Sequence, residues 1–426
     1  MKKSLLFLLF FSLVFHAKSQ ISYFPPLIGN TWQTTSFQEF KYDINYTDSL
    51  YAFLDSNNSK GFIVLYDGKI VVEKYFDQFT VDSFWYWASA AKSLTSFLVG
   101  MTEEKGLVDL GMPVNTYLGN GWTSCTQQQE DAIKLWHLLS MSSGLDDAVP
   151  DVDCTDPSCL KFKSDPGTRW AYHNGPYHLV HDIIEGQSGK SMTAFTSENL
   201  GVNTGMTGVW LDHVFYSKPR SMARFGLLML NRGIWNQNTL LQNTQYFDSM
   251  TVSSQSINPA YGLLWWLNGK DTFMVPQIQL RFKGSLISSG PSDMYAALGK
   301  NDQKIYIVPS EKLVVVRVGN ETGTPVLGPS SFDSELWDHI NRWRSVPSSV
   351  SYLKEESQVI YPNPNRGQFQ LTSEQTVQTI YDQQGKAVEF SQTGNEINLA
   401  QFSSGFYAVI LHDQNGQTRV ARMQVQ

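Results

Sequence analysis

Ser89 and Lys92 are the first pair of residues in this sequence whose types and spacing could do chemistry. From residue 85 onward, apolar residues recur at positions 90, 91, 94, 97, 98 and 101, which is the spacing of a buried helix. Residues three apart share a helix face, so the lysine amine can reach the serine hydroxyl. A lysine desolvated against aromatic residues has a lowered pKa and can take the serine's proton, and the helix N-terminus would stabilise the resulting charge.

The spacing alone is weak evidence, because it recurs at Ser158 and Lys161 and again at Ser351 and Lys354. A structural alternative for Ser89 is to cap the start of the helix. Only the first pair stands at the start of an apolar helix.

A second candidate is Tyr172, followed two residues later by Asn174. We expect both in a loop before a helix over Tyr177–Gly186. A tyrosine near a lysine ammonium favours its phenolate, so Tyr172 can pass protons between nucleophile and leaving group. The same Tyr-x-Asn pattern recurs at residues 361–363, so it is also weak by itself.

Taken in order, five motifs resemble the serine hydrolases grouped with class C β-lactamases, penicillin-binding DD-peptidases, related carboxylesterases and 6-aminohexanoate-oligomer hydrolases. They are Ser89-x-x-Lys92, Leu138–Leu145 (LLSMSSGL), Pro166–Asn174 (PGTRWAYHN), Met222–Leu228 (MARFGLL) and Tyr261–Trp266 (YGLLWW). By this resemblance Ser89 is the acylated nucleophile, and Lys92 and Tyr172 are the base and proton shuttle. Asn174 would steady Lys92 and the substrate amide. The implied fold is α/β: an antiparallel sheet flanked by helices, with an inserted helical lobe near residues 115–205 and the site between sheet and lobe.

One more motif of this family, a basic residue with a glycine two positions after it, aligns best with Tyr295–Lys300. Ala297 stands in place of the basic residue, ahead of Gly299. The N–H groups of Ser89 and Lys300 can still form the oxyanion hole. In this family the basic residue helps to bind the carboxylate of the substrate. Its absence here weakens the case for a β-lactam or D-Ala-D-Ala substrate and favours an ester or a short amide.

Other patterns predict elements that position this site and argue against other kinds of active site. The runs 61–66 and 69–75, which turn about Asp67-Gly68, predict a strand pair, and 135–145 predicts a helix ending in a Ser/Gly turn. The sequence contains no Gly-x-Ser-x-Gly, which argues against an α/β-hydrolase. His173, His178 and His181 cluster without a His-Glu-x-x-His pattern, so we expect neither a metal nor another cofactor.

Composition places the protein among globular, exported chains. Of the 426 residues, 42% are apolar and only 17% charged, which excludes a disordered chain. Residues 1–19 have the positive start, short apolar core and small residues of a secretory signal, and no later apolar run could span a bilayer.

The net charge of -7 argues against a nucleic-acid partner. Among three cysteines, a bridge between Cys154 and Cys159 is favoured in an oxidising compartment, with Cys125 left over or paired with one of them.

The polar, Ser-rich residues 346–357 predict a linker between a hydrolase domain at 20–345 and a small all-β module at 358–426. The module resembles the C-terminal sorting domain of type IX secretion through Tyr361–Pro364 (YPNP), Ile380–Lys386 (IYDQQGK), Ser404–Tyr407 (SGFY) and a last strand over Val420–Val425. The resemblance implies that the secretion machinery is a partner and that the destination is the cell surface or the medium. An immunoglobulin-like or carbohydrate-binding sandwich is the alternative.

We therefore expect an exported serine hydrolase that acts through an acyl-enzyme on a small ester, amide or peptide. The alternatives are a β-lactamase or D-Ala-D-Ala carboxypeptidase, a catalytically silent penicillin-binding-like protein, and a surface adhesin that binds through its β module.

Overall fold

The computed structural model has two separate hydrophobic cores, one between Trp32 and Trp343 and one between Ile360 and Val425. It describes residues 22–36, 39–323, 328–344, 360–371, 375–383, 386–412 and 418–426. The predicted signal (1–19) and linker (346–357) lie outside these residues. Each core is described by itself below.

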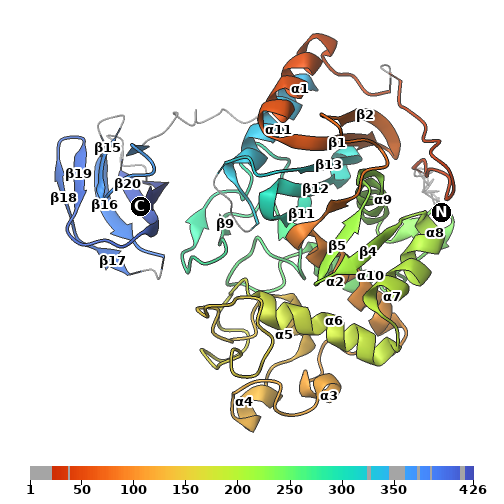
Figure 1. The fold of residues 1–426 in the computed structure, drawn as a ribbon, viewed down its shortest axis with the longest axis horizontal. Helices are drawn as coiled ribbons and strands as arrows, with labels where there is room; N and C mark the ends of the chain where they lie inside the picture. Colours follow the sequence, from red (N-terminus) through yellow and green to blue (C-terminus); the bar gives the residue numbers. More distant parts are fainter. Residues whose placement is uncertain are drawn as a thin grey trace, which may run out of the picture.

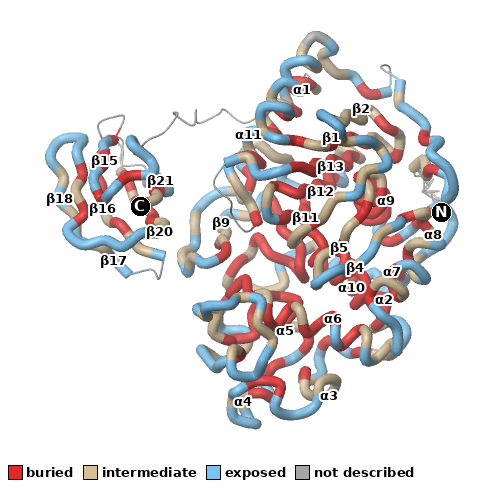
Figure 2. The backbone as a smooth tube through the Cα atoms, viewed as in Figure 1, coloured by how far each residue is buried: buried red, intermediate tan, exposed pale blue. Residues whose placement is uncertain are grey.

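A six-stranded antiparallel sheet is the centre of the larger core (Figure 1). Its order is β2 (Lys69–Tyr75), β1 (Ser59–Tyr66), β13 (Leu313–Gly319), β12 (Gln303–Val308), β11 (Tyr295–Gly299) and β8 (Trp266–Leu267). The hairpin predicted about Asp67-Gly68 is confirmed, since Tyr66 pairs with Lys69. Every residue of β11, β12 and β13 is buried, as the tube in Figure 2 shows, and these buried residues include the polar or charged Gln303, Lys304 and Arg317.

Helices cover both faces of this sheet. Successive residues of a strand point to opposite faces, and β12 shows both contacts. Ile305 lies against Gly226 of α9 (Pro219–Leu230), where an added Cβ would come within 3.1 Å of it. Its neighbour Tyr306 packs against Trp337 of α11 (Ser331–Trp343), with ring centroids 5.7 Å apart. Helix α1 (Thr47–Ser56) lies beside α11, where Phe53 stacks on Phe332 at 5.6 Å.

The predicted helical lobe is present between the first strands and α9. It contains α3 (Asn115–Leu118), α4 (Gln127–Asp131), α5 (Leu135–Leu139), α6 (Asn174–Ser188), α7 (Met192–Thr196) and α8 (Val202–Thr204). Leu135–Leu139 is the helix expected before the Ser/Gly turn. Helix α2 (Ala91–Glu104) packs against both α6 and β11, so it joins the lobe to the sheet.

Short strands complete this part of the chain. β3 (Trp85–Tyr86), β5 (Val214–Ser217) and β4 (Gly208–Leu211) form a three-stranded sheet. The remaining elements are β6 (Ile234–Trp235) paired with β7 (Asn238–Thr239), α10 (Thr244–Thr251), and β9 (Thr272–Phe273) paired with β10 (Phe282–Lys283).

The C-terminal residues form two four-stranded antiparallel sheets around the second core. One contains β14 (Ile360–Tyr361), β15 (Gln368–Leu371), β19 (Glu396–Leu399) and β18 (Phe390–Thr393); the other contains β17 (Ala387–Val388), β16 (Thr376–Tyr381), β20 (Gly405–His412) and β21 (Thr418–Val425). The alternating patterns of residues 367–371, 377–381, 405–411 and 419–425 predict four strands, and these are present as β15, β16, β20 and β21. The turn residues Gln384-Gly385 and Asn415-Gly416 lie outside the described residues.

The disulfide is the one that the sequence favoured. Cys154 and Cys159 form a disulfide, and Cys125 is free. Within the part of the chain that the structure describes, no helix is long and apolar enough to cross a membrane.

A buried arginine ties the sheet to the loop that follows β11. Arg317 of β13 has no exposed surface. It donates hydrogen bonds to Ser59 Oγ (3.0 Å) and to the carbonyl oxygens of Asn57 (2.6 Å), Asn301 (2.9 Å), Asp302 (3.1 Å) and Asn320 (3.0 Å). Three separate segments therefore depend on one guanidinium group.

We predict that Arg317→Met lowers the free energy of unfolding by about 3 kcal/mol or more, because several buried acceptors lose their donor at once. Urea unfolding of the full chain measures this. Arg232→Met is the control, since Arg232 pairs with Asp248 at the surface and its loss should cost less than about 1 kcal/mol. Equal losses in the two variants would contradict the assignment.

Candidate active site

Ser89 lies in a tight 3-10 turn, Ala88–Ala90, that runs directly into α2. Ala88 has a left-handed backbone (φ 47°), which costs a residue with a Cβ about 1–2 kcal/mol. The preceding Trp87 holds the turn, because its N–H bonds Phe215 O of β5 at 2.8 Å. Ala90, rather than Ser89, is the N-cap of α2, so Ser89 does not have the capping role considered as an alternative.

Lys92 is buried beside this turn and directed at the serine. Its Nζ lies 3.2 Å from Ser89 Oγ, and only 4% of the residue is exposed. The amine lies over two aromatic rings, 4.2 Å from the Tyr177 centroid and 5.3 Å from that of Tyr172. Burial lowers the pKa of Lys92 to about 7, and the Asp153 carboxylate opposes this only in part. At neutral pH a large fraction of Lys92 is therefore the free amine, which can act as a base.

Tyr172 is packed into an aromatic cluster at the same place. It stacks on Trp266 with centroids 5.8 Å apart and meets Tyr261 edge-on at 6.2 Å. Burial raises the pKa of Tyr172 well above its ordinary value, and its interaction with Ser89 offsets only part of this. The expected phenolate is therefore not what the structure favours. The desolvation that frees the lysine amine also keeps the tyrosine protonated.

Asn174 begins α6, so this helix starts before the expected Tyr177 and Asn174 is not in the preceding loop. Its Nδ2 donates to Asp153 Oδ1 at 2.8 Å, whereas no hydrogen bond to Lys92 is found between these two described residues. Its Oδ1 is buried with no hydrogen-bond partner among the described residues. The disulfide loop lies directly on this helix start, because a Cβ on Gly175 would come within 2.4 Å of Cys154 O.

β11 lies against the serine turn on its other side. Ala297, the residue in the place of the family's basic residue, is completely buried and pairs with Ile305. A Cβ on Gly299 would lie 2.5 Å from Trp87 O and 3.1 Å from Ser89 N. Only glycine allows this approach, which brings the end of the strand and Lys300 beside Ser89.

The loop after Lys300 holds this end of the strand in place. Asn301 and Asp302 both have left-handed backbones (φ 58° each). Asn301 O accepts from Gln303 Nε2 at 2.8 Å as well as from Arg317, and its Nδ2 donates to Tyr86 OH at 2.8 Å. Tyr86 lies two residues before the serine turn, so this contact connects the loop to the segment that leads into the turn.

Two residues close to Lys92 were not singled out from the sequence. Tyr177 supplies the nearer ring, and its hydroxyl is fixed by Thr95 Oγ1 and His181 Nε2, each at 3.0 Å. Its position three residues after Asn174, on the same helix face, was the available signal. No sequence pattern of this kind pointed to Asp153, because it lies in an irregular loop.

Two of the three histidines of the sequence cluster, His178 and His181, lie against His213, with ring centroids 4.0 and 5.1 Å away. His181 also bonds Thr95, whereas both ring nitrogens of His173 are buried with no partner among the described residues. Throughout the described ranges, no group of three or more His, Cys, Asp or Glu residues could hold a metal ion.

Two family models match separate parts of the chain. The family model described as Beta-lactamase matches residues 58–334, about two thirds of the chain. The chain belongs to this β-lactamase family. The model described as Secretion system C-terminal sorting domain matches residues 359–426, so the β-lactamase-family domain is followed by a sorting tail, and the protein is exported to the cell surface or the medium.

Solved structures with the same fold are numerous. A Bacillus anthracis protein assigned as a 6-aminohexanoate-dimer hydrolase has a TM-score of 0.57 at 20% identity, covering 77% of this chain and 91% of its own. A family VIII carboxylesterase has 0.52 at 14% identity (74% and 99%), and EstA from Arthrobacter nitroguajacolicus has 0.53 at 12% (71% and 96%). No curated protein sequence matches. At these identities the likeness shows the fold, a β-lactamase/transpeptidase-like sheet with helices.

We predict that Gly299→Ala lowers the rate of ester hydrolysis by about a hundredfold or more, because the added Cβ forces the strand away from the serine turn. Gly186→Ala is the control, since a Cβ there meets no atom within 4 Å. Hydrolysis of a p-nitrophenyl ester and urea unfolding, measured on both variants, separate a loss of activity from a loss of folding. A Gly299→Ala enzyme with full activity would contradict the proposed role of β11.

We also predict that kcat/KM rises with pH through a midpoint of about 7, because only the neutral form of Lys92 accepts a proton. Asp153 raises the pKa of Lys92, so the variant Asp153→Asn should move this midpoint to lower pH. The side-chain oxygen of the new asparagine can still accept the hydrogen bond from Asn174. A midpoint that moves to higher pH, or a rate that does not change with pH, would exclude Lys92 as the base.

Proposed function

We propose that this protein is an exported serine hydrolase that cleaves small esters or short amides through an acyl-enzyme on Ser89. The observation that carries the proposal is the buried Lys92 amine, 3.2 Å from Ser89 Oγ and with a pKa lowered to about 7. An amine of this kind is both close enough and basic enough to activate a hydroxyl at neutral pH.

In the first half of the reaction, Lys92 takes the Ser89 proton as Oγ attacks the carbonyl carbon. The N–H groups of Ser89 and Lys300 stabilise the oxyanion that forms. Tyr172, a protonated phenol in this environment, donates its proton to the leaving group and is reprotonated from Lys92. The leaving group departs as an alcohol or amine, and the acyl group stays on Ser89.

In the second half, a water molecule replaces the leaving group. Tyr172 takes the proton of the water as it passes its own proton to the Lys92 amine, and the hydroxide attacks the acyl carbonyl. Lys92 then returns this proton through Tyr172 to the serine oxygen as it leaves, so both groups regain their starting states. Asn174 orients the substrate through its buried, unpartnered Oδ1, which accepts from an amide N–H where the substrate has one. No cofactor is needed for either half.

The substrate preference follows from Ala297. A buried methyl group stands where β-lactam and D-Ala-D-Ala substrates would meet a cation for their carboxylate. The names of the carboxylesterase and the aminohexanoate-dimer hydrolase among the structural neighbours agree with an uncharged ester or short amide. Lactam hydrolysis is the second candidate, favoured by the exposed Lys300 at the end of β11, whose amine could replace that cation.

The test is hydrolysis of p-nitrophenyl butyrate and of a chromogenic cephalosporin by the full chain and by Ser89→Ala. We expect ester turnover that falls about a thousandfold or more in the variant. Mass spectrometry should show a phosphonyl adduct on Ser89 after treatment with a fluorophosphonate.

Ser158→Ala is the matched control, because Ser158 has the same spacing to a lysine but is exposed in the disulfide loop. It should retain full activity. If the wild type hydrolyses neither substrate faster than Ser89→Ala and forms no adduct, the hydrolase proposal fails and a silent binding protein becomes the better account. Faster turnover of the cephalosporin than of the ester would instead favour the lactamase.

A further inference from the structure

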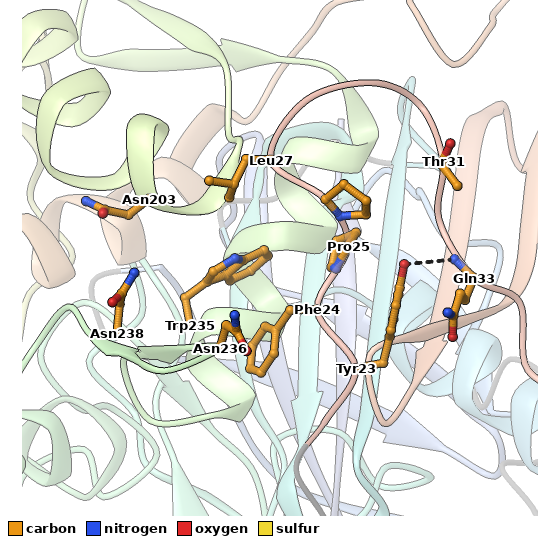
Figure 3. A pocket seen from close by; sticks show the side chains of 11 residues that line it. Tyr23, Phe24, Pro25, Leu27, Thr31, Gln33, Asn203, Trp235, Asn236 and Asn238 are labelled. Atoms are coloured by element: carbon orange, nitrogen blue, oxygen red, sulfur yellow. Dashed lines mark hydrogen bonds between the residues drawn. The ribbon is translucent and has the colours of Figure 1, made fainter.

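A cavity of about 400 Å³ lies away from the catalytic candidates, none of which lines it. Its walls come from three places: the N-terminal residues 23–33, Asn203 of α8, and the hairpin formed by β6 and β7 (Figure 3). The volume is that of a small-molecule site.

Aromatic rings form the apolar side of this cavity. Trp235 of β6 is 2% exposed and contacts Phe24, with ring centroids 5.1 Å apart and planes at 55°. Figure 3 shows these two rings side by side, with Tyr23 farther along the same N-terminal segment. The rings therefore offer an apolar wall that is already fixed.

A buried arginine next to the aromatic wall holds together the segments that form the cavity. Arg224 of α9 lies 5.8 Å from the Trp235 ring centroid. It donates to Pro26 O at 2.7 Å and to Thr204 O at 2.6 Å, so one side chain joins the N-terminal segment to the end of α8. Gly205 makes the approach possible, because a Cβ there would lie 2.5 Å from Leu27 O.

Carboxamide side chains form the polar side. Gln33, Asn203, Asn236 and Asn238 all line the cavity. Of these, Asn203 donates to Asn199 O at 3.1 Å. The side chains of Gln33, Asn236 and Asn238 make no hydrogen bond to any described residue, so their donors and acceptors are available to a ligand. No acid, lysine, arginine or histidine is among the lining residues.

We propose that this cavity binds a neutral sugar ring, as one unit of an oligosaccharide. A sugar has an apolar C–H face that packs on aromatic rings and a rim of hydroxyl groups that both donate and accept, as carboxamides do. An anion or cation would find no opposite charge in the lining, and a purely apolar ligand would leave the carboxamides desolvated. Because the protein is exported to the cell surface or the medium, the cavity would meet its ligand outside the cell.

The test uses the full chain with three neutral probes, cellobiose, maltose and N,N′-diacetylchitobiose, in saturation-transfer NMR and calorimetry. We expect at least one to bind with a Kd on the order of 1 mM or tighter. The double variant Asn236→Ala/Asn238→Ala should weaken that binding by about tenfold or more. Gln237→Ala, in the same hairpin between the two asparagines but not lining the cavity, should leave the affinity unchanged.

Two results would overturn the proposal: no binding of any probe at concentrations on the order of 10 mM, or binding that the double variant retains in full. Binding of cyclohexanol without binding of any sugar would show an apolar site instead. Ester turnover is measured on the same samples, and Ser89→Ala should bind the sugar as the wild type does. A failure of this proposal is therefore distinct from a failure of the hydrolase proposal.

Discussion

The burial of one amine against two tyrosine rings is the constraint on which the rest of the site depends. Lys92 lies between the rings of Tyr172 and Tyr177, with Ser89 Oγ as the only hydrogen-bond partner found for its Nζ among the described residues. Helix α2 brings the amine, the turn before it brings the Ser89 hydroxyl, and α6 brings Tyr177. Because the same desolvation lowers the pKa of the lysine and raises that of the tyrosine, one environment produces a base and an acid side by side.

This arrangement is unfavourable for stability, and the surrounding fold compensates for it. A left-handed Ala88 precedes the serine, and left-handed Asn301 and Asp302 follow the end of β11. Such residues persist only where neighbouring structure fixes them. Here Arg317 and Gln303 bond the carbonyl groups of the loop, and Gly299 lets β11 approach the serine turn without a clash. The buried polar network of the sheet thus supports the geometry of the site.

Local patterns predicted much of this structure. The hairpin of β1 and β2, the helices α5 and α6 and the C-terminal strands follow from periodicity and turn residues, and the Ser89–Lys92 spacing brings the serine of the turn beside the lysine in the first turn of α2. Properties that depend on packing between distant segments were not predictable. The protonated state of Tyr172 requires knowledge of its burial against Trp266, and the bond of Asn174 to Asp153 requires the path of the disulfide loop. The aromatic and carboxamide residues around the N-terminal cavity come from segments about 170–200 residues apart, so no sequence motif unites them.

The most direct test is the pKa of Lys92 itself. Lysine labelled with ¹³C at Cε and ¹⁵N at Nζ gives a separate NMR titration curve for each residue, and the spectrum of Lys92→Met identifies the resonance that belongs to Lys92. The account predicts a midpoint of about 7. A midpoint near the ordinary lysine value of about 10.4 would mean that Lys92 remains an ammonium at neutral pH, and Ser89 would then lack its base.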